Sequence, residues 1–148
     1  MSEIDRDKLA SDAEALHGFN RSIVEEFRAN DGNVSDLPGG EVLLLHTTGA
    51  RSGKPRLTPL AYLAVDGRML IVGSSLGAHK DPAWAHNLRA NPRAHVEVGT
   101  DAHDVVAHEV PREERDELFA RVTELAPVLA EYQAKTDRVI PLFELTPA

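Results

Sequence analysis

An Asp-Gly pair at positions 66 and 67 separates two apolar runs, 57–65 and 68–74, and no other feature restricts the fold as strongly. Asp-Gly between extended apolar runs predicts a β-hairpin, because both residues tolerate the backbone angles of a tight turn. A second hairpin is expected from residues 94–98 and 102–110, and further strands from 41–47 and 140–145. About six strands joined mostly as hairpins favour an antiparallel sheet or barrel and disfavour a Rossmann domain.

Helices are expected to pack outside these strands. Within residues 5–29, the apolar side chains Leu16, Phe19, Ile23 and Phe27 recur at the spacing of one amphipathic face. Asp81 is expected to cap a helix that starts at Pro82 and ends at residue 90. A charged helix after position 111 and a shorter one over 128–135 complete the set.

The length and composition indicate one α+β domain. The chain has 148 residues, of which 42% are hydrophobic and 27% charged, as in ordinary globular domains. We therefore expect a single domain over 1–148, with an N-terminal helix and loop at 1–40 and the core at 41–148.

Several classes of function are disfavoured. The net charge of −8 argues against nucleic-acid binding, and no apolar run is long enough for membrane insertion. The absence of cysteine excludes thiol chemistry and fits a cytoplasmic location. Seven histidines lack metal-binding spacing, so no metal is expected, and His46 on its apolar strand is expected to be a core histidine.

The segment between the first two strands carries the clearest signal for a ligand. Glycines at 49 and 53 permit a tight loop, and Arg51, Lys54 and Arg56 lie on it with several hydroxyl side chains. From position 51 to 93 there are seven cations and two acids, although the whole chain is acidic. The pattern suits a phosphate or polycarboxylate, whereas the alternative is an ordinary hairpin loop with solvated charges.

Trp84 is the only tryptophan and follows a second glycine-containing loop. A tryptophan in this position either packs in the core or covers a flat aromatic ligand.

Three segments in order give the chain a family resemblance: TTGARSGKPRLTPLAY (47–62), LIVGSSLGAHKDPAWAHNLRANP (70–92) and AEYQAKTDRVIPLFEL (130–145). Together they resemble the deazaflavin (F420)-dependent nitroreductase family over roughly residues 41–146. The resemblance implies a split β-barrel of the FMN-binding-like type, mostly antiparallel, with flanking helices.

The resemblance also implies a site. The cofactor's phosphodiester and acidic tail would be held by Ala50, Arg51, Ser52, Lys54, Arg56, Leu57 and Thr58. Its ring would lie along Val72, Gly73, Ser74 and Ser75, and the other side would be closed by Ala83, Trp84, Ala85, His86 and Asn87. Tyr62 and Tyr132 would line the substrate pocket, and Tyr132 and Ser74 are the expected catalytic residues. Ala85 stands where the family often has tyrosine, which affects substrate choice more than cofactor binding.

The implied reaction is hydride transfer from reduced F420 to an electron-poor small molecule such as an enone, a quinone or a nitroaromatic. The protein would then be an F420H2-dependent oxidoreductase, and a homodimer is a possible assembly. Two alternatives stay open: an FMN-dependent oxidoreductase on the same barrel, and a non-catalytic protein that binds or carries F420.

Overall fold

The computed structural model describes residues 13–34, 41–74 and 77–148, and its strands close into a barrel. The order around the barrel is β1-β2-β3-β6-β5-β4, and all six pairings are antiparallel. The strands are β1 (Glu41–Thr48), β2 (Pro55–Val65), β3 (Arg68–Val72), β4 (Arg93–Val98), β5 (Asp101–Glu109) and β6 (Leu142–Pro147). The expected antiparallel α+β barrel is confirmed.

The β2–β3 hairpin forms at the predicted turn. Val65 pairs with Arg68, and the two residues between them, Asp66 and Gly67, have φ angles of 52° and 77°. Positive φ at both central positions matches the right-handed twist of the flanking strands, which explains why Asp-Gly stands there.

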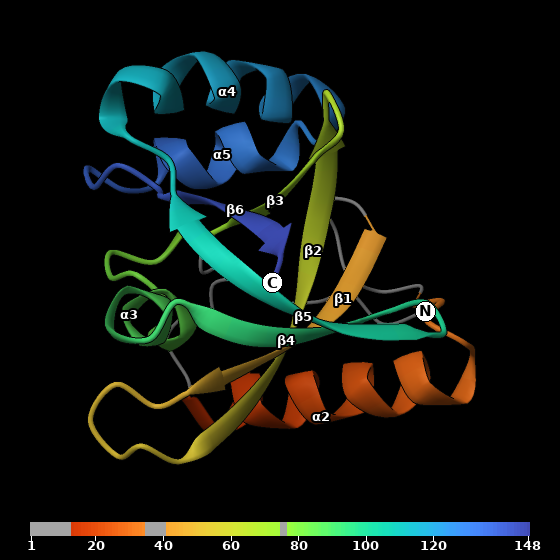
Figure 1. Cartoon of the computed structure of the whole chain (residues 1–148). Helices are drawn as coiled ribbons and strands as arrows, with labels where there is room; N and C mark the ends of the chain where they lie inside the picture. The colour runs from red at the N-terminus through yellow and green to blue at the C-terminus, as the bar shows by residue number, and fades with distance from the viewer. Residues whose placement is uncertain (1–12, 35–40, 75–76) are drawn as a thin grey trace.

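Four helices surround the barrel in the described part of the chain (Figure 1). The helices α4 (Arg112–Leu125) and α5 (Val128–Ala134) lie together on one side. The long helix α2 (Ala13–Ala29) runs along the opposite side, and α3 (Ala83–Ala90) lies directly before β4. Of the predicted N-terminal helix, residues 5–12 lie outside the described residues.

The strand β1 is buried on both faces, which explains its unbroken apolar run. Leu43 and Leu45 face the barrel interior, while Val42 and Leu44 pack against Ile23 and Phe27 of α2 and neighbouring residues. A third apolar cluster lies between the barrel and the pair α4 and α5. The apolar face of α2 is therefore used in packing, and none of the described helices is long and apolar enough to cross a membrane.

Two local predictions are wrong. Asp81 does not cap α3: the cap position is Pro82, and it makes no side-chain capping bond. The carboxylate of Asp81 instead accepts hydrogen bonds from Arg89 at 2.9 Å and Arg138 at 2.7 Å, and these cations outcompete the backbone amides.

His46 is not a core residue either. Its side chain is 36% exposed on the outer face of β1, and Nε2 lies 2.6 Å from Glu97 Oε2. The same carboxylate oxygen accepts a hydrogen bond of 3.0 Å from Arg28, so this contact ties α2 to the barrel. The division of residues 1–148 into one domain stays a prediction.

Candidate functional site

The loop between β1 and β2 is closed by its own hydrogen bonds. The Gly49 amide donates to the Lys54 carbonyl at 2.8 Å, and the Gly53 amide donates to the Gly49 carbonyl at 3.0 Å. Gly53 has a φ of +67°, a conformation that favours glycine. A Cβ on Gly49 would come within 2.5 Å of Ser52 Oγ, so a larger residue at this position requires the Ser52 side chain to move.

Asn87 fixes this loop to α3. The Ala50 amide donates to Asn87 Oδ1 at 2.9 Å, and Asn87 Nδ2 donates to Thr47 Oγ1 at 3.2 Å. The Asn87 residue is only 7% exposed, so its amide group depends on these two partners. The loop and α3 are therefore held as two walls of one site.

An open cleft of about 970 Å³ lies between these walls. Its volume is at the upper end of the usual range for ligand pockets, which suits an extended ligand. In the part of the chain that the structure describes, no aspartate or glutamate lines this cleft, although the chain is acidic overall. The lining residues are Asn20, Gly49, Ala50, Arg51, Ser52, Pro55, Arg56, Leu57, Thr58, Ala83, Trp84, His86 and Asn87.

The loop cations are available for a ligand. Among the described residues, Arg51, Lys54 and Arg56 are exposed and form no ion pair. By contrast, Arg68 binds Glu114 and Glu144, and Arg89 binds Asp81 and Glu109, so these two arginines are neutralised within the protein. Three of the cations predicted for residues 51–93 thus keep their charge unneutralised at the loop, where it attracts anions.

Trp84 both packs in the core and lines the cleft. It is 5% exposed, and its ring meets the Phe143 ring edge-on at 5.6 Å between centroids. The two interpretations of this tryptophan are therefore compatible, because Trp84 belongs to the apolar cluster of the barrel interior and is also among the residues that line the cleft.

Ten of the sequence-predicted cofactor residues meet at this cleft, five lie outside its lining, and one falls outside the described residues. Ala85 is fully buried in the barrel interior, and Lys54 lies on the loop outside the cleft lining. Val72 ends β3, and the amide of Gly73 is already used in a 2.9 Å bond to the Pro141 carbonyl. The ten are Ala50, Arg51, Ser52, Arg56, Leu57, Thr58, Ala83, Trp84, His86 and Asn87.

Ser74 follows Gly73, and its carbonyl accepts hydrogen bonds from the Gly77 amide at 2.9 Å and from Arg138 at 2.8 Å. Ser75, the next predicted ring contact, lies outside the described residues. The catalytic role of Ser74 stays a prediction.

Tyr62 lines a different cavity, of about 520 Å³, together with Glu41, Asp31 and Asp101. Its hydroxyl donates to Glu41 Oε2 at 2.8 Å. Burial, reinforced by the hydrogen bond and the charge of Glu41, raises the pKa of Tyr62 to about 12. The phenol is therefore neutral at physiological pH, with its proton directed at Glu41.

Tyr132 is 3% exposed and belongs to the apolar cluster beneath α4 and α5. It is not among the residues that line the cleft of about 970 Å³. The predicted roles of Tyr62 and Tyr132 in a substrate pocket stay predictions.

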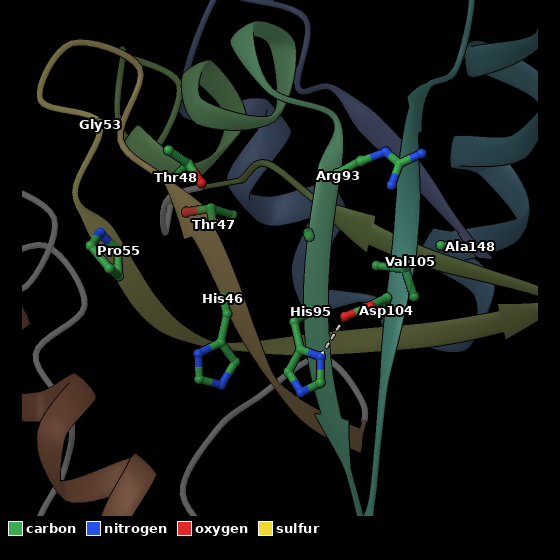
Figure 2. Close-up of a pocket in the computed structure, with 11 residues that line it drawn as sticks. His46, Thr47, Thr48, Gly53, Pro55, Arg93, His95, Asp104, Val105 and Ala148 are labelled. Carbon is green, nitrogen blue, oxygen red and sulfur yellow. Dashed lines mark hydrogen bonds and ion pairs between the residues drawn. The ribbon is translucent and has the colours of Figure 1, made fainter.

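The cleft also contains residues that sequence reasoning missed as ligand contacts: Asn20, Gly49 and Pro55. Gly49 and Pro55 flank the predicted cations and could have been included on that ground. Asn20 could not, because nothing in the α2 sequence tells which of its polar residues faces the loop. Pro55 also borders a hollow of about 360 Å³ on the other side of the loop, where His46, His95 and Arg93 lie (Figure 2).

The fold and the site together define a small antiparallel-barrel protein with an open cleft lined by two arginines. The family model for F420H(2)-dependent quinone reductase matches residues 19–147. An F420H(2)-dependent quinone reductase of Mycobacterium tuberculosis (strain ATCC 25618 / H37Rv) is 37% identical over 127 residues, covering 81% of this chain and 84% of the relative. The chain belongs to the F420H(2)-dependent quinone reductase family.

Solved structures agree with this membership. A structure described as an F420-H2 dependent reductase is 39% identical, covers 77% of this chain and 100% of its own, and superposes with a TM-score of 0.63. Another, described as a domain-swapped dimer, is 37% identical, covers 85% of this chain and 96% of its own, and has a TM-score of 0.65. The expected cofactor, F420, and the expected class, an F420H2-dependent oxidoreductase, are confirmed by the family.

Proposed function

We propose that the protein holds F420 in the cleft between the β1–β2 loop and α3 and reduces a quinone-type acceptor. The observation that carries this proposal is the cleft itself: Arg51 and Arg56 line it, and among the described residues no acidic side chain does. The membership of the F420H(2)-dependent quinone reductase family supplies the chemical class.

The residues present fit this cofactor. F420 carries a phosphodiester and carboxylates, and such anions bind best to arginine and to backbone or hydroxyl donors. Arg51 and Arg56 would supply the charge, with Lys54 nearby on the same loop, and the hydroxyls of Ser52 and Thr58 would add neutral donors. The hydrogen bond from Ala50 to Asn87 keeps these groups in place before the ligand arrives, which lowers the entropic cost of binding.

The contribution of the chain to the reaction is positioning. Reduced F420 supplies a hydride when it is bound. Trp84 would cover one face of the ring from α3, and the 72–75 segment would lie along its other side, so that the reacting carbon and the acceptor are held at reactive distance. Hydrogen-bond donors near the acceptor oxygen would stabilise the charge that develops there.

Tyr132 and Ser74 are the candidate donors, and the burial of Tyr132 among apolar side chains favours a packing role for its ring. Tyr132→Phe separates these roles. A slower single-turnover oxidation of reduced F420 by the quinone, with F420 affinity unchanged, supports donation. An unchanged rate assigns the proton to Ser74 or to water.

The proposal further includes a small-molecule partner, a homodimeric assembly and a cytoplasmic location. It includes no binding of nucleic acid. The similar structure described as a domain-swapped dimer supports the homodimer. Sedimentation of the purified protein at two concentrations measures the mass directly, and a monomer at both would contradict it.

The decisive experiment is a titration of the purified protein with F420 and with FMN, followed by addition of a naphthoquinone to the protein with reduced F420. Saturable binding of F420 and oxidation of the reduced form only when quinone and protein are both present support the proposal. Binding without turnover indicates a carrier, and tight binding of FMN with quinone reduction indicates a flavoenzyme.

A further inference from the structure

The guanidinium of Arg138 holds the backbone of the segment that follows β3. Its side chain is 14% exposed and donates hydrogen bonds to three carbonyls. Nη1 donates to Gly73 at 3.0 Å, Nη2 to Ser74 at 2.8 Å and Nε to Ala78 at 2.8 Å. A fourth bond, from Nη1 to Asp81 Oδ1 at 2.7 Å, compensates the buried charge.

Arg138 is itself held in place by the segment that precedes it. Gln133 Nε2 donates to the Arg138 carbonyl at 2.7 Å. The other end of the Gln133 amide, Oε1, accepts from Arg115 Nη2 at 2.8 Å and from the Ile140 amide at 3.1 Å. Through its main-chain carbonyl, Arg138 therefore belongs to a polar network that reaches Arg115 on α4 and Ile140, two residues before β6.

Asp81 extends this network to the wall of the cleft. Its second oxygen accepts a bond of 2.9 Å from Arg89, which stands on α3. Arg89 also lies 5.7 Å from the centroid of the Phe143 ring, against which Trp84 packs. One set of contacts thus connects the 73–78 backbone to the helix that carries Trp84.

The orientation of the peptide plane between Gly73 and Ser74 determines which way the Ser74 N–H points. In a trans peptide the C=O and the following N–H point to opposite sides. Because the Gly73 carbonyl faces Arg138, the Ser74 amide faces away from it. Within the described part of the chain this amide makes no hydrogen bond, so it is available to an acceptor on the opposite side of the segment.

We propose that Arg138 is a positioning residue for the reaction. By holding the carbonyls of Gly73, Ser74 and Ala78, it fixes the segment along which the F420 ring lies. It thereby also points the Ser74 N–H at a hydrogen-bond acceptor atom of the bound molecule. This inference rests on the proposed function. In this proposal, the segment that carries Gln133 and Arg138 supports the backbone of the cofactor site and does not itself contact the cofactor.

The test compares Arg138→Gln with Arg121→Gln. Arg121, an exposed residue of α4, is also bonded to an aspartate, Asp66 of the β2–β3 turn, so its replacement controls for the loss of one charged pair. Amide hydrogen exchange of the cofactor-free protein is measured first. The Gly73 and Gly77 amides, bonded to Pro141 and Ser74, should exchange at least about tenfold faster in Arg138→Gln only.

Single-turnover oxidation of reduced F420 by the quinone is measured next. In Arg138→Gln the rate should fall roughly 10- to 100-fold, the effect expected of a misplaced reactant, while the Kd for F420 changes little because Arg51 and Arg56 are intact. Arg138→Lys should not restore the rate, since one ammonium cannot reach three carbonyls in the same geometry. Added guanidinium ion should partly restore the rate of Arg138→Gly.

An unchanged rate together with unchanged exchange in Arg138→Gln would overturn the proposal. If this variant does not fold, Arg138→Lys decides: it keeps the positive charge beside Asp81 but cannot hold the three carbonyls, and unchanged rate and exchange there would overturn the proposal equally. A wild-type protein that binds no F420 refutes the proposed function, and the exchange measurement still tests the hold of Arg138 on the segment.

Discussion

Ala50 and Asn87 are 37 positions apart, yet the backbone amide of the first donates to the side chain of the second at 2.9 Å. This single bond connects the cationic loop to the helix that faces it across the cleft. The shape of the cleft therefore depends on one buried carboxamide.

Asn87→Ala should cost about 1–3 kcal/mol of the free energy of unfolding, because the Ala50 amide and the Thr47 hydroxyl lose their partner. It should also weaken F420 binding, since the loop is no longer fixed. Denaturant unfolding and F420 titration measure the two effects. Asn91→Ala, an exposed asparagine at the end of the same helix, is the matched control and should change neither.

Replacement of either loop arginine should weaken F420 binding. Arg51→Ala or Arg56→Ala removes a cation that lines the cleft without an internal partner, so about 1–3 kcal/mol of binding free energy should be lost in each. Higher salt should reduce the affinity of the wild type more than that of either variant. Arg112→Ala on α4 changes the net charge equally and should leave the Kd unaltered; equal weakening there would assign the effect to net charge alone.

Trp84 reports on both of its environments. Trp84 is the only tryptophan, and its emission should be quenched saturably by F420, because this residue lines the cleft. Trp84→Ala should destabilise the fold by about 3–5 kcal/mol through the cavity left beside Phe143. Trp84→Phe should retain most of the stability and lose cofactor affinity. Unchanged Trp84 emission on addition of F420 would show that Trp84 is not in the binding site.

The phenol of Tyr62 should lose its proton only at a pH above the usual range for tyrosine. Its pKa is raised from 10.0 to about 12, so the folded state favours the neutral phenol. The stability from this preference is fully present below pH 10 and should be lost as pH rises from 10 to 12. The unfolding free energies of the wild type and Tyr62→Phe should therefore converge over this window. Glu41→Gln should lower the pKa by removing the charge; no difference between the proteins from pH 10 to 12 would contradict the assignment.

The sequence was most informative where structure depends on near neighbours. The Asp66-Gly67 turn, the glycine loop and the short helix with Trp84 are each encoded within a few residues, and all form as expected. The loop cations were also identified, because their charge and spacing are visible without knowledge of the fold.

Features that depend on distant partners were not predictable. Asp81 matches the pattern of a helix cap, but Arg138, 57 positions later, takes its carboxylate. From the sequence, the charge of Arg68 is expected to be free for a ligand. The pairing of β3 with β6 instead places Glu144 beside Arg68, where it neutralises this charge. His46 follows an apolar run, and its partner Glu97 lies 51 positions later on β4.

The position of β6 also sets when the fold can form. This strand, residues 142–147, enters between β3 and β5, so both of those strands keep an unpaired edge until it arrives. During synthesis on the ribosome, β3 and β5 therefore keep these edges exposed until residues 142–147 have emerged, and such edges are sites for association with other chains. The barrel can close only after β6 has been made.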